Sequence, residues 1–168
     1  MRARKSTPRY GVLAVVFSIG MLGFSIARAE EQTATRDVAV VVHTEVPKTE
    51  LTFTEVRRIF LGEVQYWDQK GLRVTLLIRA PEARERTVLL ERVYEMSENQ
   101  FRQYWIGKLF RGDMPIGPKV VSSGEMTAQL AAAIPGSITF MDAAAVPQGL
   151  KVLKIDGHLP GESGYPIQ

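Results

Sequence analysis

Short apolar runs rich in β-branched residues alternate with amphipathic helical segments, and this alternation constrains the fold more than any other feature of the chain. The expected strands are DVAVVVH (37–43), RVTLLI (73–78), KVV (119–121), SITFM (137–141) and KVLKI (151–155). A continuous apolar run such as 37–43 is typical of a strand buried on both faces in a parallel sheet. Helices between most of the strands predict an α/β domain with a largely parallel sheet flanked by helices.

The starts of several helices are marked in the sequence. Serine or threonine three residues before glutamate or glutamine predicts capping boxes at Thr52, Ser97 and Ser122. Gly62 can take the left-handed conformation that ends the helix after Thr52. A further helix is expected from Pro81, because proline suits the first helical turn. In the helix after Ser97, apolar residues recur at helical spacing: Phe101, Tyr104, Trp105 and Leu109. For Tyr104 and Trp105 this spacing favours the core over a ligand platform.

The first 29 residues have the form of a secretory signal peptide. Basic residues precede the apolar run GVLAVVFSIGMLGFSIA, which ends in ARA at Ala29 and is followed by polar EEQTATRD. We expect cleavage after Ala29 and a periplasmic or secreted protein, with membrane contact only through the uncleaved signal. An uncleaved anchor is the alternative, because the apolar run is close to the length of a membrane span. The remaining chain divides into a flexible leader (30–36), one domain (37–157) and an irregular tail (158–168) rich in glycine and proline.

Charge and cysteine content exclude several classes of protein. Five of the 21 basic residues and none of the 18 acidic residues precede residue 30, so 16 basic and 18 acidic residues remain, a net charge of −2. Such a chain has no electrostatic footprint for nucleic acid. Without cysteine, it offers neither a disulfide nor a thiol nucleophile.

Enzymatic chemistry is not indicated by any motif. The two histidines, His43 and His158, are far apart in the sequence and have no cysteine partners, so we expect no metal site and no cofactor. The serine nucleophile patterns G-x-S-x-G and S-x-x-K are absent. We therefore expect a protein that is not an enzyme.

Polar residues at the ends of three strands are the candidates for binding a small anion. Ligands of open α/β sheets lie beyond the carboxyl ends of the strands, where helix N-termini present free N–H groups. Thr44, Arg79 and the pair Ser122 and Ser123 occupy such positions. The serines and Arg79 have another interpretation, since Ser122 fits a helix cap and Arg79 can pair with Glu82 or Glu85.

Two segments resemble a known family. LTFTEVRRIFLGEVQYWDQ (51–69) is similar to the L…E…IFLGK…W.D segment of the phosphate-binding proteins of bacterial ABC uptake systems, and PGSITFMDAAAV (135–146) is similar to their PGSIGYVEYAYA segment. Between them, VTLLIRAPEARERTVLLERVY (74–94) takes the place of their R-x-D-G-S-G-T phosphate loop and the helix that follows. The resemblance spans residues 38–156 and implies a single lobe of a type II periplasmic binding protein.

The resemblance also implies a reduced binding site. Arg79 matches the arginine of the loop, but Ala83, Arg84 and Glu85 stand at the positions of its serine, glycine and threonine. The ligands of the family's other lobe have no counterpart here. The expected function is solute binding in an uptake or signalling system, with weak affinity for phosphate or another small oxyanion. The alternative is a periplasmic adaptor that contacts a sensor, transporter or envelope complex and binds no ligand.

Overall fold

The computed structural model describes residues 37–167. The signal peptide and the leader 30–36 lie outside the described residues, so both stay predictions. Within residues 37–167, none of the helices combines the length and the apolar character that crossing a bilayer requires.

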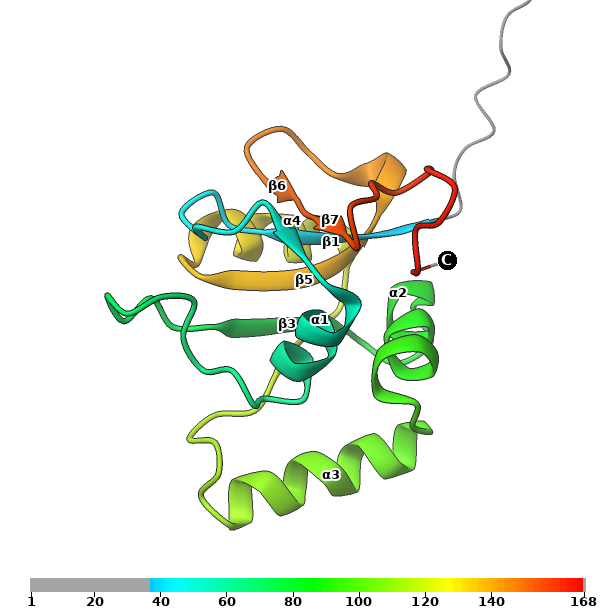
Figure 1. The fold of residues 1–168 in the computed structure, drawn as a ribbon. Coiled ribbons are helices and arrows are strands. Elements are labelled where there is room, and N and C mark those ends of the chain that lie inside the picture. Colours follow the sequence, from blue (N-terminus) through cyan, green and yellow to red (C-terminus); the bar gives the residue numbers. More distant parts are fainter. Residues whose placement is uncertain (1–36, 168) are drawn as a thin grey trace, which may run out of the picture. The chain divides into compact units, whose positions relative to one another are not determined.

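The described residues form a five-stranded sheet with the strand order β4-β3-β5-β1-β6 (Figure 1). Its strands, in chain order, are β1 (Val38–Val42), β3 (Thr75–Arg79), β4 (Lys119–Val121), β5 (Ser137–Asp142) and β6 (Lys151–Val152). Strand β3 runs parallel to both β4 and β5, which confirms the largely parallel sheet. Two shorter strands, β2 (Glu50–Leu51) and β7 (Lys154–Ile155), pair beside it in parallel.

Strand β1 departs from the predicted parallel arrangement. It is buried along its whole length, as its apolar run predicts, but it pairs antiparallel with both β5 and β6. An unbroken apolar sequence reports burial on both faces, and it carries no information about the direction of the neighbouring strands. As a result, the beginning of β1 lies beside the end of β5, where Val38 pairs with Asp142.

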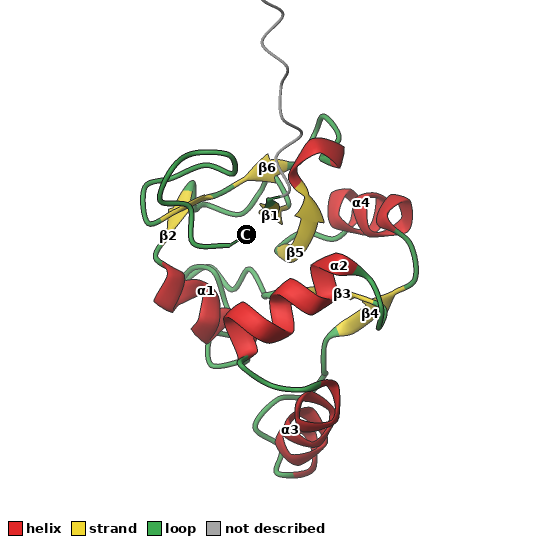
Figure 2. Ribbon diagram, turned by 90° about the vertical axis from the view of Figure 1, so that its right-hand side faces the viewer, coloured by secondary structure: helices red, strands yellow, loops and turns green. Residues whose placement is uncertain are grey.

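Helices cover both faces of the sheet. Val38, Val40 and Val42 belong to the larger core cluster, which they share with helices α1 (Phe53–Phe60), η1 (Leu89–Tyr94) and α3 (Glu98–Phe110). The opposite face of the sheet packs on α4 (Gly124–Ala133), because successive side chains of a strand point to opposite faces. Figure 2 shows α4 and α1 on different sides of β5. The short helices α2 (Arg84–Val88) and η2 (Ala143–Ala145) follow β3 and β5.

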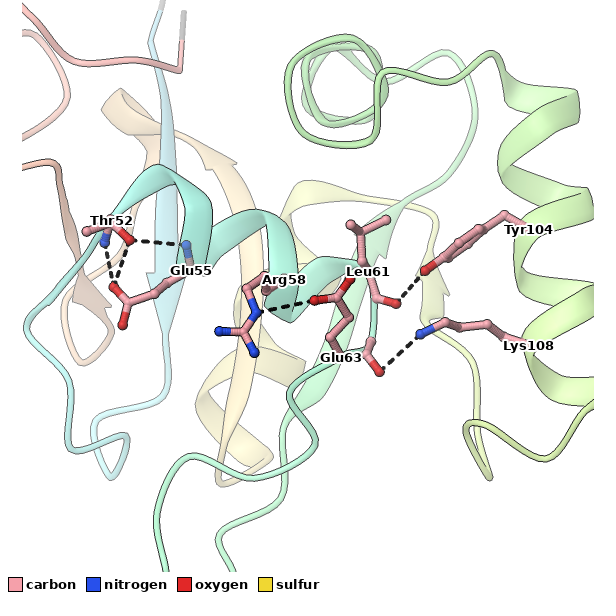
Figure 3. Close-up of polar contacts among 8 residues, drawn as sticks. Thr52, Glu55, Arg58, Leu61, Glu63, Tyr104 and Lys108 are labelled. Atoms are coloured by element: carbon pink, nitrogen blue, oxygen red, sulfur yellow. Dashed lines mark hydrogen bonds and ion pairs between the residues drawn. The ribbon is translucent and has the colours of Figure 1, made fainter.

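The helix predicted after Thr52 is confirmed at both ends (Figure 3). The Thr52 hydroxyl accepts a hydrogen bond from the Glu55 N–H, and the Glu55 carboxylate accepts one from the Thr52 N–H at 2.8 Å. Gly62 has φ +70° and Glu63 N–H returns to the Arg58 carbonyl, which is the left-handed ending expected of a Schellman motif. The second capping box, Ser97 with Gln100, is also present.

Two predicted helix starts are wrong by one to three residues. The helix after β3 begins at Arg84 rather than at Pro81, because Glu82 adopts φ +76°, which a helix cannot continue. Ser123 rather than Ser122 caps α4, and its hydroxyl accepts a hydrogen bond from Met126 N–H at 3.1 Å. The residue three positions after Ser123 is Met126, whose side chain cannot accept a hydrogen bond from the cap N–H as glutamate does. The capping box predicted for Ser122 and Glu125 therefore does not form.

The apolar stripe of α3 is buried only in part. Phe101 and Trp105 lie in the core, and Tyr104 packs against it, as predicted. Leu109, which shares their helical spacing, is exposed. The hydroxyl of Tyr104 and the ammonium of Lys108 donate to the carbonyls of Leu61 and Gly62 respectively (Figure 3), so α3 is fastened to the end of α1.

The C-terminal segment contains no helix or strand from residue 158 to 167. It is nevertheless part of the core, because Tyr165 and Ile167 are buried against β1. The Tyr165 hydroxyl donates to the Val38 carbonyl at 2.9 Å, and the Gly161 N–H donates to the Asp37 carboxylate.

Candidate functional site

A pocket lies at the edge of the sheet where the parallel strands β3 and β5 end. Its volume is about 310 Å³, and Arg79, the last residue of β3, forms part of its wall. Residues from the end of β5 and from the first turns of α2 and α4 supply most of the remaining wall: Glu85, Gly124, Glu125, Thr127, Ala128, Phe140, Met141 and Asp142. This is the position at which open α/β sheets bind their ligands.

Arg79 forms an ion pair inside this pocket. Its Nε lies 3.7 Å from Oε2 of Glu85, and the two side chains are 14% and 16% exposed. This distance is too long for a hydrogen bond. The Nε and Nη1 groups of Arg79 are buried and have no hydrogen-bond partner within residues 37–167. Of the two partners left open by the sequence, the structure therefore selects Glu85 over Glu82, and it leaves donors of the guanidinium unused.

Carboxylates outnumber the arginine in the pocket wall. Besides Glu85, the wall contains Glu125 and Asp142. The Asp142 carboxylate accepts a hydrogen bond from the Ala144 N–H at 2.9 Å, which holds it at the start of η2. Arg79 attracts an anion, but the three carboxylates repel it, because like charges at short range are repulsive.

The two serines contribute less than their position suggests. Gly124 and Glu125, the first residues of α4, line the pocket, but neither Ser122 nor Ser123 does. The Ser123 hydroxyl is engaged in capping α4, and Ser122 is exposed on the surface. The N-terminus of α4 therefore lies at the pocket as predicted, while the two hydroxyls lie outside it.

Thr44 lies at the opposite edge of the sheet from Arg79. It follows the end of β1, and because β1 runs antiparallel, Val42 pairs with Ile138 near the beginning of β5. Arg79, in contrast, ends β3, which runs parallel to β5. The expectation that the three strand ends converge is thus wrong for Thr44. That expectation requires β1 to run parallel to β5, whereas the two strands are antiparallel.

Similar folds occur among proteins of phosphate transport. The structure resembles a putative phosphate ABC transporter substrate-binding protein from Clostridium perfringens with bound phosphate (TM-score 0.59, 14% identity), an ABC-type phosphate transport receptor from Vibrio cholerae (0.58, 18%) and PstS from Borrelia burgdorferi (0.60, 17%). The described residues therefore share the fold of part of these substrate-binding proteins. No protein-family model and no curated protein matches the sequence.

The likeness covers most of this chain and about half of each periplasmic binding protein. The aligned region spans 74%, 74% and 78% of this chain but 46%, 48% and 53% of the three others, in the order given above. The chain thus corresponds in extent to about half of those proteins.

Asp142 and Glu125 were not predicted as site residues. Asp142 directly follows the strand SITFM, so the sequence signal for it is the same strand-end position that points to Arg79. Glu125 is assigned to a capping box by the sequence, whereas in the structure Ser123 caps α4 and Glu125 lines the pocket. Within the described residues, no group of three or more histidine, aspartate or glutamate side chains is placed to hold a metal ion.

Proposed function

We propose that this chain is an exported solute-binding domain of an uptake or signalling system, with a reduced oxyanion site at Arg79. The observation that carries the proposal is the buried guanidinium of Arg79, which lies at the carboxyl edge of a periplasmic-binding-protein sheet and has unused donors. A guanidinium can give two charge-assisted hydrogen bonds to phosphate or sulfate. The N-terminus of α4 adds free N–H groups at the same pocket.

Glu85 keeps this affinity low. A bound anion must displace Glu85 from Arg79 and must tolerate Glu125 and Asp142 nearby. The pocket is also partly open to water, where charges attract each other weakly. We expect a dissociation constant for phosphate of roughly 0.1 mM or weaker, equivalent to about 5 kcal/mol.

Calorimetric titration with inorganic phosphate tests the proposal. We expect little heat with the wild-type protein, a stronger signal with Glu85→Gln, and none when Arg79→Ala is added to that variant. Thr44→Ala serves as the control, because Thr44 is exposed at the other edge of the sheet and its loss should change nothing. Nanomolar binding by the wild-type protein would contradict the reduced site, and binding that survives Arg79→Ala would place the site elsewhere.

A second candidate is a periplasmic adaptor that has kept the fold and lost the ligand. The three carboxylates around Arg79 favour it, because an ion pair formed within the protein can serve stability alone. Absence of phosphate and sulfate binding in Glu85→Gln would support the adaptor over the solute-binding domain.

Intact-mass analysis of the exported protein should give a chain beginning at Glu30, and a mass that includes Met1 would contradict cleavage.

A further inference from the structure

Exposed apolar side chains gather on one part of the described domain. Seven large apolar side chains are exposed in residues 37–167, and five of them belong to α3, to the loop after it or to β4: Ile106, Leu109, Phe110, Ile116 and Val120. Phe110 is 92% exposed. Single exposed apolar residues are ordinary, whereas a cluster of this kind marks an interaction surface.

Three of these five residues, Ile106, Leu109 and Val120, line a groove between α3 and β4 with a volume of about 340 Å³. Its apolar wall consists of Ile78, Phe101, Trp105, Ile106, Leu109 and Val120. Figure 2 shows α3 beyond β4, the last strand of the sheet. The volume of the groove falls within the range of protein binding pockets, so the groove has room for one or two aliphatic or aromatic side chains from another molecule.

The groove is separate from the Arg79 pocket. Ile78 and Arg79 are neighbours in β3, so their side chains point to opposite faces of the sheet. The two pockets share no residue of their walls. A role for the groove therefore does not depend on whether Arg79 binds an anion.

The groove wall carries one positive charge that no ion pair compensates. Its charged residues are Arg86, Glu98 and Arg102. Glu98 is paired with Arg86, whereas Arg102 forms no ion pair within residues 37–167. A partner that brings negative charge to the border of the groove beside Arg102 is therefore favoured.

We propose that the groove between α3 and β4 docks a segment of a partner protein that is apolar toward the groove and acidic along its border. A second copy of this chain is disfavoured, because a symmetric contact through this surface would place Arg102 of both copies in one interface and supply no unpaired carboxylate of the groove wall for either. An anionic membrane shares the charge preference. A flat lipid surface, however, cannot fill a concave groove, which suits an inserted side chain.

Selection of a random peptide library displayed on phage against the purified protein tests this proposal. We expect the enriched peptides to combine aspartate or glutamate with leucine, phenylalanine or tryptophan. Their affinity, measured by fluorescence anisotropy with synthetic copies, should fall at least tenfold with Val120→Glu and with Leu109→Glu. Both residues are exposed, so each variant should retain the urea midpoint of the wild type. The two variants should also weaken peptide binding alike, because both place a negative charge in the same groove.

The matched control is Met126→Glu, which places the same charge on a similarly exposed apolar residue of α4 outside the groove. This variant should bind the selected peptides like the wild type. Arg102→Glu should weaken binding, and added salt should weaken it further. Failure to enrich any peptide, enrichment of basic peptides, or equal binding by Val120→Glu would overturn the proposal. So would association with phosphatidylglycerol vesicles without peptide binding, or dimerisation that Val120→Glu abolishes.

Discussion

The guanidinium of Arg86 donates two hydrogen bonds to the carboxylate of Glu98, from Nη2 at 2.7 Å and from Nε at 3.1 Å. Arg86 is buried in α2, and its Cζ lies 4.0 Å from the centre of the Phe101 ring. Glu98 is the first residue of α3. The pair therefore joins two helices beneath the apolar groove, and it stabilises a positive charge that is almost fully removed from water.

Loss of the Glu98 carboxylate should destabilise the protein. Glu98→Gln leaves the buried Arg86 charge without its counterion, and we expect a loss on the order of 2 kcal/mol in the free energy of unfolding. Glu95→Gln is the matched control, because the Arg57–Glu95 pair lies on the surface, and a clearly smaller loss is expected there. Urea denaturation of both variants at pH 7 measures the difference. Equal losses would contradict a special role for the buried pair.

The same pair should make stability depend on pH. The hydrogen bonds from Arg86 hold the pKa of Glu98 below its usual value. The stabilisation is therefore present above the pKa of the unfolded state, about 4.3, and is lost as the pH falls through the lower pKa of the folded state. Between pH 6 and pH 3 the urea midpoint of the wild type should approach that of Glu98→Gln. A constant gap would show that the carboxylate does not respond to Arg86.

Adjacent serines at the start of α4 provide a direct comparison. Ser123→Ala removes the hydroxyl that caps Met126 N–H and should cost on the order of 1 kcal/mol. Ser122→Ala removes an exposed hydroxyl one residue earlier and should cost little. Thermal or urea unfolding of the two variants decides between the cap observed in the structure and the one expected from the sequence. The reverse order of effects would restore the capping box of Ser122 and Glu125.

The elements that were predicted well are those whose signals are local. Thr52 and Glu55 at the start of α1 and Gly62 just beyond its end specify the bounds of this helix through contacts with neighbouring residues in the sequence. The errors arose where distant contacts decide. The direction of β1 depends on its pairing with β5, about 100 residues later in the chain, and this pairing moved Thr44 away from Arg79. Likewise, Leu109 shares the helical spacing of buried residues, but the sheet ends at β4, so no element is present to cover it.

Gly62 should tolerate no side chain, for two separable reasons. Its φ of +70° disfavours any residue with a Cβ, and a Cβ there would lie 2.9 Å from Cη2 of Trp105. Gly112 has a similar φ of +74° but open space around it. We expect Gly62→Ala to cost about 2–4 kcal/mol and Gly112→Ala about 1 kcal/mol, measured by urea denaturation. Equal costs would mean that Trp105 moves aside freely.

The tail should contribute strongly to stability although it has no regular structure. Ile167 is fully buried in the main core, and Ile167→Ala should cost about 2–5 kcal/mol. Ile116→Ala makes the same chemical change at an exposed position and should cost less than about 0.5 kcal/mol. Unfolding midpoints of the two variants give the comparison. A small effect of Ile167→Ala would show that the tail detaches at little cost.

The contact between the tail and β1 places the two ends of the domain together. Tyr165 and Gly161 hydrogen-bond Val38 and Asp37, so the last described residues lie against the first ones (Figure 1). A short linker could therefore join the two ends. The chain could then be opened at the exposed turn around Gly71, where a Cβ atom would have no other atom within 4 Å. The order in which the strands are synthesised is then separable from the sheet they form, and the domain is suited to circular permutation or to insertion into a loop of another protein.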